Sequence, residues 1–113
     1  MTKGKVVLVR FPFDDLSGTK VRPAVCLTDP AGPHRHVILA FITSQTPTDL
    51  LPTDVVLQPG QPAFASTGLR VASTLRLHRL MTASTSLIQR ELGTLSAAID
   101  EEITRKLRLL FTL

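Results

Sequence analysis

The sequence predicts a mostly β fold with α: a small, strongly bent antiparallel β-barrel that carries a C-terminal amphipathic helix. Short apolar segments rich in β-branched residues alternate with turn residues as far as residue 80. The apolar spacing then changes to steps of three and four residues near the C-terminus. A length of 113 residues fits one compact domain, so we expect residues 1–113 to form a single domain.

Three apolar segments predict the first strands. These segments are Val6–Val9, Pro23–Leu27 and His36–Thr43. The loop 13–21 between the first two is polar at its centre, has few apolar anchors and is expected to be a mobile flap. Residues 29–33 contain two prolines and a glycine, which is typical of a tight reversal. We therefore expect the second and third strands to pair as an antiparallel hairpin.

The middle of the chain predicts shorter elements. Residues 46–53 contain two prolines and little periodicity, and residues 58–62 form a turn around Gly60. Asp54–Leu57 is compatible with a short strand, and Leu69–Leu80 with one or two strands. A short helix is predicted over Ser86–Leu92, ended by Gly93.

The C-terminal helix has the clearest pattern. Ser96 is a suitable N-cap, acidic residues fill the first turn and basic residues the last. The apolar positions that recur at helical spacing are Ile99, Ile103, Leu107 and Leu110. These features predict an amphipathic helix that packs against the strands.

Charge is distributed unevenly along the chain. The formal net charge is +4, and residues 1–80 carry nine Lys and Arg against five Asp, whereas the remainder is balanced. A polyanion should therefore meet the first 80 residues, although four surplus charges also serve solubility alone. Arginine, the commonest basic residue here, has a planar fork that suits phosphate groups.

Several classes of protein are disfavoured. The single Cys26 excludes an internal disulfide, and one cysteine with three scattered histidines is a poor set of zinc ligands, so we expect no metal and no cofactor. No apolar run approaches the roughly 18 residues of a membrane span, and none near the N-terminus is long enough for a signal peptide. We therefore expect no membrane association and a cytoplasmic protein.

A hairpin around residues 30–35 predicts a specific pair. If opposed residue numbers add up to 65, Arg22 faces Thr43 and shares one face with Cys26, while the other face is apolar and belongs to the core. Directly opposed side chains start roughly 4.5–5.5 Å apart at Cβ, so a guanidinium and a hydroxyl would meet at the open end of the hairpin. A register slip of two residues would preserve the faces but weaken this opposition.

Motifs along the chain resemble the MazF/PemK toxins. They are Val6–Phe13, Asp15–Gly18, Arg22–Val25 and Ile42–Gln45, with looser likeness at Gly68–Leu69, Ser73 and Leu92–Ser96. Their order and spacing, taken together, carry the resemblance over nearly the whole chain. It implies a dimeric SH3-like barrel that cleaves single-stranded RNA without metal and is neutralised by a small antitoxin protein. The family's catalytic arginine and threonine fall on Arg22 and Thr43.

The chemistry of these two side chains agrees with that implication. Arginine stays protonated near neutrality, so Arg22 is a poor general base but can clamp developing phosphate oxyanions. Thr43 could donate a hydrogen bond to the same phosphate or orient the 2′-hydroxyl. Candidate RNA contacts are Ser17, Thr19 and Lys20 in the flap, Ser44 and Gln45 after Thr43, and Arg76. With no Trp or Tyr, base recognition would depend on hydrogen bonds.

No proton acceptor is assigned. His34 and His36 belong to the remote turn of the hairpin, and His78 beside Arg76 and Arg79 carries no motif resemblance, so all three favour structural roles. Cys26 is interpreted as a buried packing residue rather than a nucleophile, since no histidine is placed to activate it.

Two other functions stay open. One is a non-catalytic SH3-like binding module, such as a CcdB-like poison that acts by binding DNA gyrase. The other is a degenerate family member that binds RNA or its antitoxin without turnover, whose mark would be salt-sensitive binding. The cleavage motif and the identity of the antitoxin do not follow from the sequence.

Overall fold

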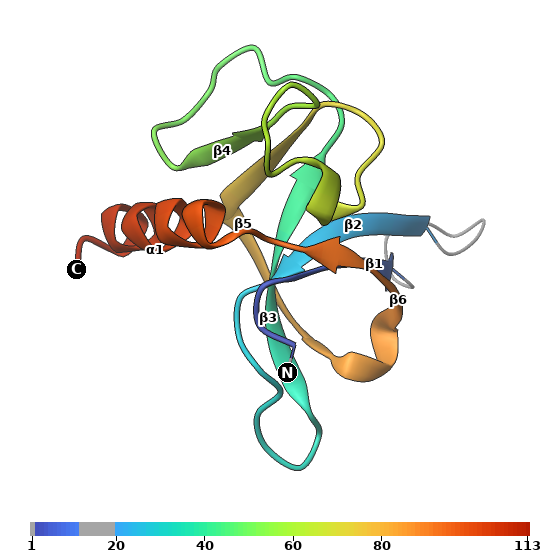
Figure 1. The fold of residues 1–113 in the computed structure, drawn as a ribbon. Coiled ribbons are helices and arrows are strands. Elements are labelled where there is room, and N and C mark those ends of the chain that lie inside the picture. The colour runs from blue at the N-terminus through green and yellow to red at the C-terminus, as the bar shows by residue number, and fades with distance from the viewer. Residues whose placement is uncertain (1, 12–19) are drawn as a thin grey trace.

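The fold is one antiparallel sheet with a helix packed on one of its faces (Figure 1). The computed structural model describes residues 2–11 and 20–113. Its elements are β1 (Lys5–Phe11), β2 (Lys20–Cys26), β3 (His36–Thr43), β4 (Asp54–Leu57), the 3₁₀ helix η1 (Ala65–Thr67), β5 (Ser73–Ser84), the 3₁₀ helix η2 (Thr85–Leu87), β6 (Ile88–Thr94) and α1 (Ala97–Phe111). The predicted flap loop lies largely outside the described residues.

The six strands follow the order β4-β5-β3-β2-β1-β6, and every pair is antiparallel. No ladder joins β4 to β6 among the described strands, so the predicted barrel is confirmed in its composition and bend but is not closed by hydrogen bonds. In place of a ladder, η1 reaches across from the β4–β5 connection and packs on β6. A segment that follows β4 therefore covers the open edge of the sheet.

Two glycines permit this close approach. A Cβ on Gly68 would lie 2.0 Å from the backbone oxygen of Leu92, and one on Gly93 would lie 2.2 Å from the backbone oxygen of Ser66. Gly68 also has a φ of +74°, in the left-handed region that glycine adopts at little cost. The seam between η1 and β6 is thus a backbone-to-backbone contact that no side chain could enter.

Apolar side chains fill both faces of the sheet. The larger cluster includes Val25, Ala40 and Leu75 and receives Ile99 and Ile103 from α1. A second cluster on the opposite face includes Ala24, Cys26 and Leu39 together with Val7 and Val9 of β1. The predicted core on the Val25 and Ala40 face is confirmed, and Cys26 on the opposite face is buried as expected.

The C-terminal helix is confirmed from its cap onward. The Ser96 hydroxyl accepts a hydrogen bond from the amide of Ile99 at 3.2 Å, which satisfies one of the first N–H groups of α1. Ile99 and Ile103 are buried, as the spacing required. Among the described residues, no helix is long and apolar enough to cross a membrane.

The helix predicted over Ser86–Leu92 is wrong. Only Thr85–Leu87 form a 3₁₀ turn, and Ile88–Thr94 is the strand β6. The reason lies far away in the sequence: β1 pairs with β2 on one side, and β6 supplies ladder partners for its other edge. Gly93 serves the seam with η1 rather than ending a helix.

The strand predicted within Leu69–Leu80 is shifted. It begins at Ser73 and continues to Ser84, and it pairs with both β3 and β4. Its pairing with β3 is interrupted: Ala40 is opposite Leu80, whereas the next residue, Phe41, is opposite Arg76. Leu77, His78 and Arg79 therefore have no partner in this ladder and form a bulge of three residues in β5.

Candidate active-site groove

The β2–β3 hairpin adopts the predicted register. Ala24 is opposite Phe41, Val25 opposite Ala40 and Cys26 opposite Leu39. At the other end of the hairpin, the amide of Leu27 donates to the Ile38 carbonyl at 2.8 Å. Continuing the ladder outward by two positions brings Arg22 opposite Thr43. The predicted face is confirmed for Val25 and Ala40, but Ile38 on the same face is 38% exposed.

Arg22 and Thr43 line one hollow at the end of this hairpin. It has a volume of about 350 Å³ and extends over three neighbouring strands, β2, β3 and β5. The residues that line it are Arg22, Pro23, Phe41, Ile42, Thr43, Ser44, Gln45 and Arg79. We call this hollow the groove. Four of the sequence candidates, Arg22, Thr43, Ser44 and Gln45, are thereby brought together.

A hydrogen bond fixes the Thr43 hydroxyl. Its Oγ1 accepts a hydrogen bond from the backbone amide of Gln45 at 3.2 Å, where the chain turns away after β3. A hydroxyl has one proton to donate as well as two lone pairs, so Thr43 keeps its donor while Gln45 orients the oxygen. The half-buried side chain therefore presents an oriented O–H at the edge of the groove.

Arg22 is exposed and carries the positive charge of the groove on the β2 side. None of the carboxylates in residues 2–11 and 20–113 forms an ion pair with it. Proline follows it in the sequence and lines the same hollow. An exposed guanidinium is a strong hydrogen-bond donor to anions such as phosphate.

Arg76 has a different partner from the one predicted. Its Nε donates to Asp54 Oδ1 at 3.2 Å and its Nη2 to Oδ2 at 3.1 Å, a two-pronged pair between β5 and β4. The Asp54 side chain is 1% exposed and also accepts from the amide of Leu51 at 2.9 Å. Arg76 does not line the groove, because a buried carboxylate holds its guanidinium. The structure thus gives Arg76 a structural partner, and its RNA contact stays a prediction.

The three remaining candidates are Ser17, Thr19 and Lys20. Ser17 and Thr19 lie outside the described residues, and Lys20 is the first residue of β2.

The histidines are exposed and away from the groove lining. His34 and His36 lie at the hairpin turn with ring centroids 5.8 Å apart, and His78 lies in the β5 bulge. No His, Asp or Glu is among the described residues that line the groove, so its chemistry is that of cations, hydroxyls and amides. Within the described ranges, no group of three or more His, Cys, Asp or Glu is placed to hold a metal ion.

Cys26 is fully buried in the second apolar cluster. Burial, and secondarily the negative charge of Glu91, raise the pKa of its thiol to about 11. A thiol with so high a pKa is not a nucleophile near neutrality, in agreement with its interpretation as a packing residue.

Sequence reasoning missed Arg79. Strict alternation along β5 would place Arg76 and Arg79 on opposite faces, and only Arg76 is among the RNA contacts expected from the sequence. The bulge breaks the alternation and brings Arg79 to the groove. The local sequence does not predict this bulge, because residues 77–79 include no glycine or proline.

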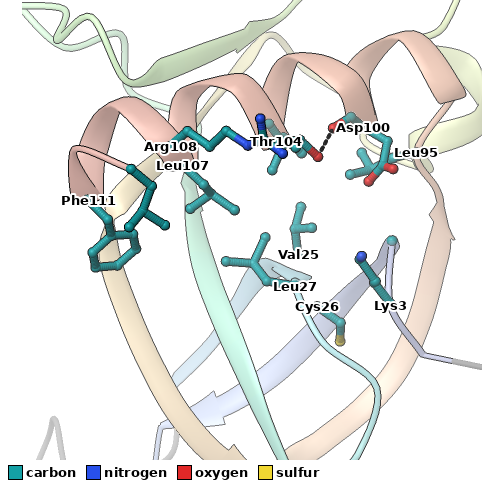
Figure 2. Close-up of a pocket in the computed structure, with 13 residues that line it drawn as sticks. Lys3, Val25, Cys26, Leu27, Leu95, Asp100, Thr104, Leu107, Arg108 and Phe111 are labelled. Carbon is teal, nitrogen blue, oxygen red and sulfur yellow. Dashed lines mark hydrogen bonds between the residues drawn. The ribbon is translucent and has the colours of Figure 1, made fainter.

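A separate hollow of about 310 Å³ lies under α1 and shares no residue with the groove. Figure 2 shows Val25 and Leu27 pointing toward Leu107 of the helix, with Lys3 and Arg108 nearby. The Thr104 hydroxyl there donates to the carbonyl of Asp100 at 3.1 Å, which is a helix-internal bond. The lining is mainly apolar and lacks the paired guanidinium and hydroxyl of the groove.

Comparison with known proteins adds a family and a set of similar folds. The family model for "PemK-like, MazF-like toxin of type II toxin-antitoxin system" matches residues 2–111. No curated protein sequence matches the chain.

Solved structures share the fold at low sequence identity. An endoribonuclease in complex with its cognate antitoxin, from a mycobacterial species, is 18% identical with a TM-score of 0.68, covering 100% of this chain and 96% of its own. Toxin MazF-mt6 of Mycobacterium tuberculosis is 21% identical with a TM-score of 0.71, covering 96% and 97%. A chain of the MazE-MazF structure from Deinococcus radiodurans is 20% identical with a TM-score of 0.70, covering 100% and 97%.

Proposed function

The chain belongs to the family of PemK-like, MazF-like toxins of type II toxin-antitoxin systems, and from this membership and the groove we propose that it is an endoribonuclease acting on single-stranded RNA. The observation that carries the proposal is the placement of Arg22 and Thr43 in one open groove. A permanent cation beside an oriented hydroxyl is suited to a phosphodiester. We further propose that residues 1–113 act as one toxin domain.

The proposed reaction uses the substrate's own 2′-hydroxyl. Its oxygen loses a proton and attacks the adjacent phosphorus, the bond from phosphorus to the 5′-oxygen breaks, and the 5′-oxygen takes up a proton. The products are a 2′,3′-cyclic phosphate and a free 5′-hydroxyl. Arg22 stabilises the negative charge that builds on the phosphorus oxygens. Thr43 donates its proton in a hydrogen bond to the same phosphate, and the backbone amide of Gln45 holds the hydroxyl oxygen in place. The group that accepts the 2′-hydroxyl proton is not assigned.

Metal independence follows from the same assignment. Arg22 supplies the fixed positive charge that a divalent cation supplies in other nucleases. We therefore propose that cleavage continues in the presence of EDTA. Ser44 and Gln45 are exposed at the end of the groove and are proposed to hydrogen-bond bases, which would make cleavage sequence-selective.

Ser17, Thr19 and Lys20 are retained as proposed RNA contacts on the strength of the sequence alone. Partners are proposed from the family: an antitoxin protein with an acidic segment, a second copy of the chain in a homodimer, and cytoplasmic RNA. The cations that line the groove support an acidic inhibitor, because an inhibitor of that charge would occupy the space of the substrate.

The test is incubation of the protein with mixed-sequence single-stranded RNA in EDTA. We expect cleavage to 2′,3′-cyclic phosphate ends, and a loss of roughly 10²–10³-fold in rate for Arg22→Ala with thermal unfolding unchanged. Arg105→Ala, which removes an exposed arginine of α1, is the matched control and should cleave as the wild type does. Intact RNA would reject the nuclease, and altered DNA supercoiling would then favour the gyrase-binding alternative. Full activity of Arg22→Ala would reject the role of Arg22.

A further inference from the structure

The bulge in β5 places a second arginine in the groove. Ala40 pairs with Leu80 and Phe41 with Arg76, so Leu77, His78 and Arg79 are inserted between two consecutive ladder positions of β3. Leu77 is fully buried in the larger apolar cluster, which anchors the bulge. His78 and Arg79 are exposed, and Arg79 lines the groove together with Arg22 and Thr43.

The two arginines flank one strand. Arg22 belongs to β2 and Arg79 to β5, and both strands are neighbours of β3, whose Phe41–Thr43 segment lines the groove between them. Adjacent strands lie about 4.8 Å apart, so the two backbones are separated by roughly 10 Å. Flexible arginine side chains on the two sides of such a floor can reach neighbouring phosphates of one nucleic-acid strand.

Arg79 and Arg76 differ in their ion pairs. Asp54 binds Arg76 through two hydrogen bonds. Arg79, like Arg22, forms no ion pair with a carboxylate in the described part of the chain. Of the two arginines in this part of β5, Arg79 is therefore the one that can neutralise a phosphate at little cost.

We propose that Arg79 binds the RNA backbone phosphate next to the scissile one and so holds the substrate across β3. This inference rests on the proposed function, because it takes single-stranded RNA as the ligand of the groove. Arg79 binds a phosphate that does not react, so it contributes to substrate binding rather than to the chemical step. Its loss should raise KM and leave kcat nearly unchanged.

The binding test uses a probe that cannot be cut. Fluorescent, mixed-sequence 2′-O-methyl RNA lacks the nucleophilic hydroxyl, and its anisotropy is titrated with protein from about 50 to 200 mM KCl. We expect Arg79→Ala to weaken binding about tenfold at the lowest salt and to reduce the slope of log K against log salt by about 0.7. Arg79→Lys keeps the charge and should keep the slope.

Arg105→Ala is again the matched control, and it should bind the probe as the wild type does. The inference is overturned if Arg79→Ala keeps the wild-type slope, or if Arg105→Ala changes the slope as much. In turnover assays, a loss confined to kcat would also overturn it. These results are separate from the fate of the proposed function: wild-type protein that binds the probe but leaves natural RNA intact rejects the nuclease, while the slopes still decide the role of Arg79.

Discussion

Arg22 on β2 and Thr43 on β3 line the same groove, two positions beyond Ala24 and Phe41, the last pair of the β2–β3 ladder. The two residues differ in how they are held. Thr43 is half-buried and its oxygen is fixed by the Gln45 amide, whereas Arg22 is exposed. The Thr43 oxygen is therefore positioned before substrate arrives, whereas the Arg22 side chain is in contact with solvent.

Thr43 can be tested by separating its hydroxyl from its shape. Thr43→Val keeps the β-branched form but removes the donor, and we expect cleavage to fall by roughly 10²-fold. Thr43→Ser keeps the hydroxyl and should retain most of the activity. Initial rates on the same RNA, with thermal unfolding as a check on the fold, measure the difference. Equal rates for the valine and serine variants would show that the hydroxyl takes no part.

The Arg76–Asp54 pair should matter for stability rather than for RNA. Arg76→Ala leaves the Asp54 carboxylate, which is 1% exposed, with the Leu51 backbone amide as its remaining hydrogen-bond partner among the described residues, and we expect the free energy of unfolding to fall by about 2–4 kcal/mol. The double variant Arg76→Leu with Asp54→Leu should recover part of the loss, because no charge is then buried. Urea denaturation measures both. An Arg76→Ala protein as stable as the wild type would contradict the structural role.

The seam between η1 and β6 can be tested with two glycines of nearly equal φ. Gly68 and Gly32 have φ values of +74° and +76°, but a Cβ on Gly68 would meet Leu92 at 2.0 Å, whereas one on Gly32 would meet nothing within 4 Å. Gly32→Ala should cost about 1 kcal/mol through backbone strain alone. Gly68→Ala should cost several kcal/mol more, because backbone has to move apart. Equal midpoints in denaturant would show that the seam is unimportant.

Cys26 should make stability depend on alkaline pH. The folded state raises the pKa of the thiol from 9.0 to about 11, so its contribution is fully present below pH 9. Between pH 9 and 11 the unfolded chain loses this proton and the folded chain keeps it, so the free energy of unfolding falls by roughly 2–3 kcal/mol. Cys26→Ala, measured in parallel, should show a flatter decline. Identical pH profiles would mean that the thiol is not shielded in the folded state.

Alkylation gives a second view of the same residue. Because Cys26 is fully buried, iodoacetamide should label the native protein only as fast as the protein unfolds. Labelling at the rate of a free thiol in native buffer would contradict the burial.

The parts of this fold that follow short-range rules could be predicted from the sequence. The register of β2 and β3 follows from the period of two on the two strands, although the turn itself pairs Ala31 with His36, two positions away from that register. The start of α1 follows from Ser96 and the apolar spacing. These elements also placed Arg22, Thr43, Ser44 and Gln45 correctly at one end of the hairpin.

The parts that depend on distant partners could not. β6 has a local pattern that suited a helix, and only the free edge of β1 decides that it is a strand. The pairing of Arg76 with Asp54 requires the β4–β5 register, and the arrival of Arg79 in the groove requires the bulge. In each of these cases the local sequence is compatible with more than one structure, and contacts with residues distant in the sequence decide which one forms.

The bulge of β5 divides the strand into two halves that are held separately. Ser73–Arg76 pairs with β4 and with the end of β3, while Leu80–Ser84 pairs with the beginning of β3. The exposed residues of the segment between them can be substituted without changing the register of the ladders on either side. Positions 78 and 79 can therefore be substituted while the pairs that specify the architecture stay as they are.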